Sequence, residues 1–158
     1  MSDRQPMTVS GKAKLELELK NLISKERPAI IKAIEEARGH GDLSENADYD
    51  AAKDRQGMIE GRIADIQGKL ANSEVVDTAV LESRTIIFGA FVELQDTETD
   101  EKVKYQIVGE DESDVKQGKV SIFSPIARSL IGKKKGDVIE FKSPKGEKEF
   151  EVLNFYFK

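Results

Sequence analysis

The fold is decided by residues 45–70, which read ENADYDAAKDRQGMIEGRIADIQGKL. Alternating steps of three and four residues separate one set of mostly apolar positions, namely Tyr49, Ala52, Gln56, Ile59, Ile63, Ile66 and Leu70. This spacing is a heptad seam, in which one face of an α-helix packs against another helix. We therefore expect a long helix from Glu45 onward that forms half of a coiled coil.

A second helical pattern precedes it, from Ser10 to Arg38, with Thr8 or Ser10 as the expected N-cap. Its apolar positions are Leu15, Leu19, Leu22, Ile23, Ile30, Ile34 and Ala37. Both segments span roughly 26 to 29 residues, or about 40 Å at the helical rise, so we expect them to pair. Pro28 costs about 3 kcal/mol inside a helix, which predicts a kink near residues 25–27.

Between the two helices lies a short connection, Gly39-His40-Gly41-Asp42-Leu43-Ser44. Connections of this length join adjacent antiparallel helices. The sequence therefore predicts a helical hairpin with its tip near Asp42.

After about Ser73 the apolar period becomes strand-like and turn signals separate the runs. The expected strands are Thr85–Phe88, Phe91–Leu94, Val103–Val108, Val120–Phe123, Val138–Phe141 and Phe150–Phe157. One short helix is expected at Pro125–Ile131, with Ser124 as N-cap and Gly132 at its end. The fold class is thus α+β, with a coiled-coil hairpin over residues 1–77 and a small antiparallel β-sheet domain over residues 78–158.

The composition excludes several function classes. The net charge of −5 argues against a protein that coats duplex DNA. The chain has no cysteine and a single histidine, so disulfides, thiol catalysis and cysteine-ligated zinc are excluded. No apolar run approaches the length of a membrane span, and we expect a cytoplasmic protein.

Asp42 and Glu45 are the candidate chemical residues. Their spacing fits a capping box at the start of the second helix. It also fits half of a site for Mg²⁺, which takes one or two carboxylates from a protein and completes its shell with water and phosphate oxygens. Because an exposed tip has no pocket for a substrate, another macromolecule must complete any active site. This favours a cofactor protein over an enzyme.

Arg38, Lys53 and Arg55 are candidate phosphate contacts on the two helices near that tip. The alternative is that they are solvated charges paired with acidic residues along the same helices. The residue pattern alone leaves both interpretations open.

Two motifs resemble the bacterial Gre transcript-cleavage factors. The first is EARGHGDLSENADY, residues 36–49, which is similar to the hairpin tip of that family. The second is SPIARSLIGKKKGD, residues 124–137, which is similar to its C-terminal signature. The resemblance extends over nearly the whole chain.

The resemblance implies an FKBP-like C-terminal domain that docks on the rim of the secondary channel of RNA polymerase, with Ser124, Pro125 and Ile126 near the contact. The hairpin then enters the channel. The resemblance also implies that Asp42 and Glu45 help to retain a Mg²⁺ ion shared with the polymerase active centre, so that polymerase cleaves backtracked nascent RNA near its 3′ end. We expect the isolated protein to bind no metal. Arg38 matches an RNA-contacting position of the family, Lys53 matches another less exactly because an arginine is common there, and Arg55 is added from its place on the helix. We expect a monomer with no membrane contact.

Three other functions are compatible with a helical hairpin and a small β-sheet domain. A non-cleaving regulator could occupy the same channel, although a zinc-bearing regulator of the DksA type is disfavoured by the lack of cysteine. A prolyl isomerase is disfavoured because few aromatic residues and no tryptophan are available for a prolyl pocket. A coiled-coil adaptor would use the tip acids only as a helix cap.

Overall fold

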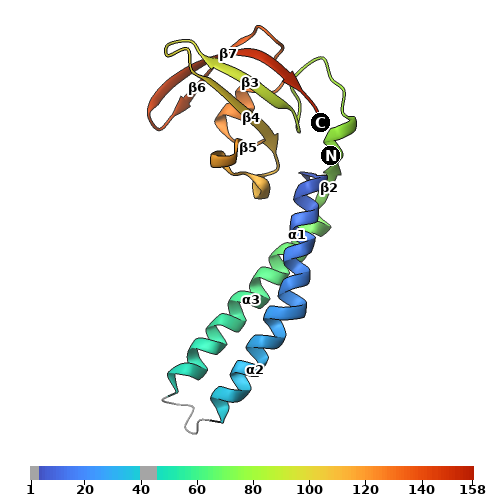
Figure 1. The fold of residues 1–158 in the computed structure, drawn as a ribbon, viewed down its shortest axis with the longest axis vertical. Helices are drawn as coiled ribbons and strands as arrows, with labels where there is room; N and C mark the ends of the chain where they lie inside the picture. The colour runs from blue at the N-terminus through green and yellow to red at the C-terminus, as the bar shows by residue number, and fades with distance from the viewer. Residues whose placement is uncertain (1–3, 40–45) are drawn as a thin grey trace. The chain divides into compact units, whose positions relative to one another are not determined.

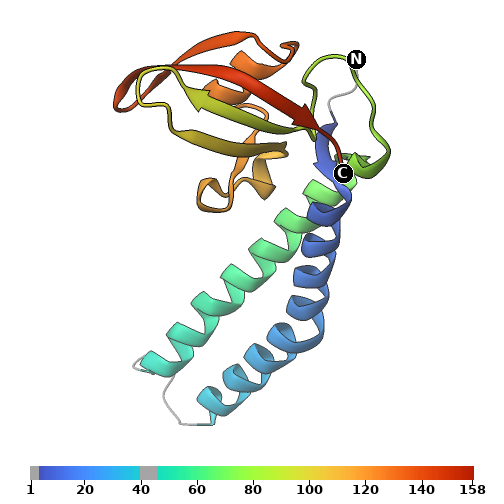
Figure 2. The same ribbon diagram turned by 45° about the horizontal axis from the view of Figure 1, so that its top comes forward.

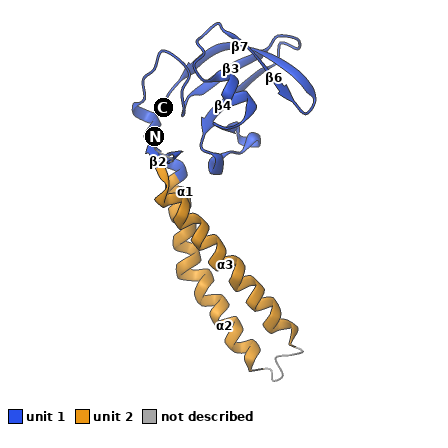
Figure 3. Ribbon diagram, turned by 180° about the vertical axis from the view of Figure 1, so that it is seen from behind, with its two compact units in different colours: residues 1–11, 74–158 blue, residues 12–73 orange. Residues whose placement is uncertain are grey.

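The computed structural model describes residues 4–39 and 46–158 of the chain. The chain forms two compact units, residues 12–73 and residues 1–11 with 74–158 (Figure 3). The first eleven residues thus belong with the C-terminal part, whereas the sequence placed them with the helices. Each unit is described by itself below.

The unit of residues 12–73 is a pair of antiparallel helical segments (Figure 1). The first runs through α1 (Val9–Asn21), the π-helical segment η1 (Leu22–Glu26) and α2 (Arg27–Arg38). The second is α3 (Ala47–Ala71). Their shared core consists of Ile30, Ile34, Ala52, Ile59 and Ile63, with Tyr49 packed against it. The predicted heptad seam and helical hairpin are therefore confirmed.

The segment η1 replaces a regular turn just before Pro28. The amide of Arg27 donates to the carbonyl of Leu22, five residues back, where an α-helix would bond four residues back. This wider turn places Pro28 in the first turn of α2, where the missing amide N–H of proline costs no helical bond. The wider turn also adds about one residue between the buried positions of α1 and those of α2. Ile23, within this turn, is 38% exposed.

The unit of residues 1–11 and 74–158 contains two sheets. A two-stranded sheet pairs β1 (Gln5–Thr8) with β2 (Ser73–Val76). A five-stranded sheet has the order β5-β4-β3-β7-β6. Its strands are β3 (Phe91–Asp96), β4 (Lys102–Val108), β5 (Lys119–Ser121), β6 (Val138–Ser143) and β7 (Gly146–Tyr156).

A short helix, α4 (Pro125–Leu130), packs on one face of the curled five-stranded sheet (Figure 2). Ile126, Ala127 and Leu130 are buried in one cluster with Val92 and Leu94 of the sheet. The hydroxyl of Ser124 accepts from the amide of Ala127 as the N-cap, as expected. This cluster is the core of the unit.

The α+β class is confirmed, but two details of the predicted sheet are wrong. The sheet is mixed, because β4 and β5 pair in parallel. Thr85–Phe88 is not a strand: the amide of Ile86 donates to the carbonyl of Lys133, and the carbonyl of Ile86 accepts from Gly132. Ile86 is fully buried in this loop. An apolar residue buried in a loop gives the same sequence pattern as one buried in a strand, which explains the wrong prediction.

Candidate functional site

The start of α3 is fixed by Asn46. The side-chain oxygen of Asn46 accepts from the amide of Tyr49 at 3.1 Å, the bond of a helix N-cap. The capping-box interpretation of Asp42 and Glu45 stays a prediction. Asp42 and Glu45 themselves lie outside the described residues.

The same side chain reaches the other helix. Its amide nitrogen donates to the carbonyl of Ala37, in the last turn of α2, at 2.5 Å. Ala37 is 3% exposed and Ala52 is 9% exposed, so the packed seam continues to this end of the hairpin. Asn46 thus joins the two helix ends that flank residues 40–45.

The three candidate cations have different surroundings. Arg38 is exposed in the last turn of α2. Lys53 donates to the amide oxygen of Gln56 at 3.1 Å, a neutral partner. Arg55 forms an ion pair with Glu26 on the opposite segment, 3.3 Å between Nη2 and Oε2. Arg55 therefore has a role in helix pairing, and its partner lies across the seam instead of along the same helix.

Further along the hairpin, charged pairs join the helices. Arg62 donates to both carboxylate oxygens of Glu18, at 2.6 and 2.8 Å, and also to Asp65. Hydrogen bonding from Arg62 lowers the pKa of Glu18, and bonding to Glu18 raises the pKa of Arg62. Arg27 and Glu60 form a second two-bond pair. These pairs are solvent-facing, so they set the register of the helices more than their stability.

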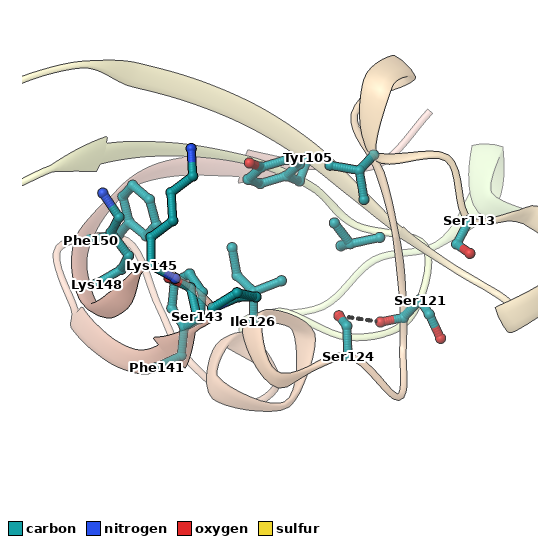
Figure 4. A pocket seen from close by; sticks show the side chains of 13 residues that line it. Tyr105, Ser113, Ser121, Ser124, Ile126, Phe141, Ser143, Lys145, Lys148 and Phe150 are labelled. Atoms are coloured by element: carbon teal, nitrogen blue, oxygen red, sulfur yellow. Dashed lines mark hydrogen bonds between the residues drawn. The ribbon is translucent and has the colours of Figure 1, made fainter.

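A separate cavity of about 610 Å³ lies beside α4 in the other unit (Figure 4). Ser124 and Ile126 line it, whereas Pro125 occupies the first position of α4 and is not part of the lining. Ser124 also donates to the carbonyl of Ser121 at 2.6 Å, which fixes the loop that leads into the helix. Two of the three predicted docking residues therefore lie at one concave surface.

Aromatic side chains supply much of the apolar wall of this cavity. Tyr105, Phe141 and Phe150 line it, and the rings of Phe141 and Phe150 stack at 5.7 Å. Although aromatic residues are few in this chain, three of them converge here from β4, β6 and β7. Sequence periodicity marks all three as strand residues but gives no sign that the strands bring them together.

The described residues are 4–39 and 46–158. Within these ranges no group of three or more His, Cys, Asp or Glu side chains is arranged to hold a metal ion. No helix in the same ranges is long and apolar enough to cross a bilayer.

Family comparison then decides the identity of the two units. A model described as "Transcription elongation factor, N-terminal" matches residues 5–75, and one described as "Transcription elongation factor, GreA/GreB, C-term" matches residues 81–157. The chain belongs to the GreA/GreB family of transcription elongation factors.

Several GreA/GreB relatives match over almost the whole chain. A protein of Maricaulis maris named transcription elongation factor GreA is 56% identical over 149 residues, with 94% of this chain and 95% of that protein covered. The protein of the same name from Trichlorobacter lovleyi is 51% identical with all of both chains covered. Among solved structures, GreA factor homolog 1 of Thermus thermophilus is 27% identical to this chain. The match includes 97% of this chain and 99% of that protein, with a TM-score of 0.45.

Proposed function

We propose that this GreA/GreB factor binds bacterial RNA polymerase in its secondary channel and stimulates the cleavage of backtracked nascent RNA by the polymerase. One observation carries the proposal. Asn46 caps α3 and also bonds to the carbonyl of Ala37 in α2, so the two helices are joined at the end where the connection that contains Asp42 and Glu45 begins. Family membership supplies the polymerase as the partner.

The hairpin has the dimensions for such a role. Helix α3 contains 25 residues, or about 37 Å of length at the helical rise. A pair of helices of this length can carry residues at its end into a channel that a compact domain cannot enter. The factor then acts as a cofactor of polymerase and is not an enzyme by itself.

Asp42 and Glu45 would help to hold a Mg²⁺ ion shared with the polymerase active centre. Carboxylate oxygens are the ligands that Mg²⁺ prefers, and two of them leave its other positions to water and phosphate. When bound there, the ion supplies charge stabilisation for phosphodiester hydrolysis. The role of the two side chains is to bind and orient. The isolated protein is proposed to bind no metal tightly.

Among the cations, Arg38 and Lys53 suit contact with the 3′ end of the backtracked RNA. Arg38 is exposed at the end of α2, and the ammonium of Lys53 contacts only an uncharged amide among the contacts described. Arg55 suits this role less well, because Glu26 already neutralises its charge. Two phosphate contacts of this kind are sensitive to salt.

The cavity beside α4 is the proposed polymerase contact. Its apolar wall fits an apolar side chain of a partner, and Lys145 among its lining favours an acidic neighbour, whereas Lys148 is already paired with Asp96. We place the docking surface at Ser124 and Ile126 within this cavity, with Pro125 as the residue that starts α4. The factor acts as a monomer in the cytoplasm, where polymerase works.

The test adds the protein to halted, backtracked elongation complexes and measures 3′ RNA fragments with time. Wild type should raise the cleavage rate above that of polymerase alone. The double variant Asp42→Ala, Glu45→Ala should give no stimulation while it still competes with wild type for polymerase. A wild-type protein that binds but leaves the rate unchanged would identify a non-cleaving channel regulator instead. Full activity of the double variant would also overturn the proposal.

A further inference from the structure

The ends of the tip connection are tied by one side chain, that of Asn46. Its oxygen accepts from the amide of Tyr49 in the first turn of α3, and its nitrogen donates to the carbonyl of Ala37 in the last turn of α2. The carbonyl of Asn46 also accepts from the amide of Asp50. One residue therefore bonds to both helices at the point where the hairpin seam ends.

The chemistry of these two bonds requires a carboxamide. A helix N-cap needs only an acceptor, which Ser, Thr and Asp supply as well as Asn. The bond to Ala37 needs a donor that extends further than a hydroxyl and does not repel a carbonyl oxygen. Since one partner is an N–H and the other a C=O, the orientation of the Asn46 amide is also fixed by its neighbours.

Packing around Asn46 makes the bond to Ala37 effective. Ala37 is buried, Ile34 is 6% exposed and Tyr49 packs against the same cluster. The helix ends are thus held by apolar contacts on one side and by the Asn46 amide at the end. A connection with both ends fixed has fewer accessible arrangements than one attached to fraying helices.

We infer that Asn46 is a positioning residue for transcript cleavage. It holds the two helix ends at a fixed separation, so that the carboxylates carried between them meet the polymerase active centre in one arrangement. Asn46 does not touch the reacting atoms. This role rests on the proposed function, and it is separate from the contribution of Asn46 to capping.

The separating variant is Asn46→Ser. Serine keeps an acceptor for the Tyr49 amide but is too short to donate to Ala37. Asn46→Ala removes both bonds. Asn21→Ser is the matched control, because Asn21 is an exposed residue at the end of α1 whose side chain makes no capping bond.

The first measurement needs no polymerase: amide hydrogen exchange at Tyr49 and Gly39, together with circular dichroism. Asn46→Ser should have the helicity of wild type, and exchange of the Tyr49 amide should remain slow. Exchange of the Gly39 amide, which bonds to the last turn of α2, should become faster. Asn46→Ala should speed exchange at both amides. Unchanged exchange at Gly39 in both variants would show that the bond to Ala37 holds nothing in place.

The second measurement is the cleavage rate as a function of factor concentration. A positioning role predicts that Asn46→Ser lowers the rate at saturation by about ten- to a hundredfold, because small misplacements of catalytic groups are costly, and leaves the half-saturating concentration unchanged. Asn21→Ser should match wild type. A normal saturating rate for Asn46→Ser, or a rise only in the half-saturating concentration, would overturn the inference. A wild-type factor without stimulation would instead refute the proposed function, whatever the variants do.

Discussion

The carboxylate of Glu112 occupies the space in which a side chain at Gly11 would stand. A β-carbon built on Gly11 would lie 2.1 Å from Oε1 of Glu112. The same carboxylate accepts from the amides of Thr8 and Gly109, each at 3.0 Å, and from the hydroxyl of Thr8. Thr8 in turn caps α1 by accepting from the amide of Gly11. A glycine in the first turn of a helix is therefore explained by a residue about a hundred positions away.

Replacing Gly11 with alanine should destabilise the protein. In an unconstrained helix this substitution stabilises by about 1 kcal/mol, because alanine is the best helix former. Here the methyl group must displace Glu112 and break its bonds, so we expect a net loss of about 1 to 3 kcal/mol. Urea unfolding followed by circular dichroism measures the change.

The control for this prediction is the Glu112→Ala background. Once the carboxylate is absent, Gly11→Ala should show the ordinary stabilising sign, so the substitution reverses its effect between the two backgrounds. A loss of equal size in both backgrounds would mean that the contact with Glu112 is not the reason for glycine.

Removing the tip carboxylates should leave the fold intact. Since Asn46 caps α3, the variant Asp42→Ala, Glu45→Ala should change the free energy of unfolding by no more than about 0.5 kcal/mol. Asn46→Ala should cost about 1 kcal/mol, the usual value of an N-cap. Thermal unfolding of the three proteins at one concentration gives the comparison. An equal loss of unfolding free energy in the two variants would indicate that Asp42 and Glu45 also cap the helix.

The pair of Glu18 and Arg62 should give a small, pH-dependent stabilisation. Bonding to Arg62 lowers the pKa of Glu18 from its ordinary value of 4.5. The stabilisation is therefore complete above pH 4.5 and disappears as the pH falls through the lower folded-state pKa. Both side chains are about 40% exposed, so solvent screening limits the effect to about 1 kcal/mol or less.

This prediction is checked by urea unfolding of wild type and Glu18→Gln across the acid range. The two proteins should differ at neutral pH and converge below the folded-state pKa. In an Arg62→Met background the pH-dependent effect of the same substitution should be much smaller, with only the charge of Lys69 left to lower the pKa of Glu18. A difference that persists at low pH would point to lost packing and not to a lost charge.

A charge in the cavity beside α4 should weaken polymerase binding. Val115 lines the cavity and is 69% exposed, so Val115→Glu should fold normally. We expect about a tenfold rise in the factor concentration for half-maximal cleavage, equivalent to about 1.4 kcal/mol, with the same rate at saturation. Val80→Glu is the matched control: Val80 is 74% exposed in the 3₁₀ helix η3 (Thr78–Val80), outside the cavity, as Val115 is exposed in the 3₁₀ helix η5 (Val115–Gln117). Equal effects of the two variants would remove the cavity from the docking surface.

The parts of the fold that depend on short-range periodicity were predictable. The seam from Tyr49 to Leu70 follows from residue spacing, because each buried position repeats every helical turn or two. The π-helical turn at Leu22–Glu26 was not predictable. Pro28 indicates that the helix is irregular nearby, but it does not specify which hydrogen-bond pattern replaces the regular one. The signal available in the sequence was the spacing from Leu22 to Ile30, which is eight residues where a heptad repeat has seven.

The candidate functional residues also include some that the sequence predicts and some that it does not. Asp42 and Glu45 stand out because of their residue type at a chain reversal. The cap at Asn46 was hidden by the neighbouring acids, which fit the capping pattern equally well in sequence. The cavity depends on which strands are neighbours in the sheet, and no local pattern specifies that Tyr105, Phe141 and Phe150 face one space.

The pairing of β1 with β2 has a consequence for synthesis on the ribosome. Strand β1 is made at the start of translation, but its partner strand begins only at Ser73, and Glu112, which bonds to Thr8, follows later still. The contacts of α2 with α3 are closer in sequence and can form as soon as residue 71 has emerged. The nascent chain can therefore complete its hairpin and pair β1 with β2 a few residues later, whereas Thr8 gains its bond to Glu112 only when the C-terminal part is made.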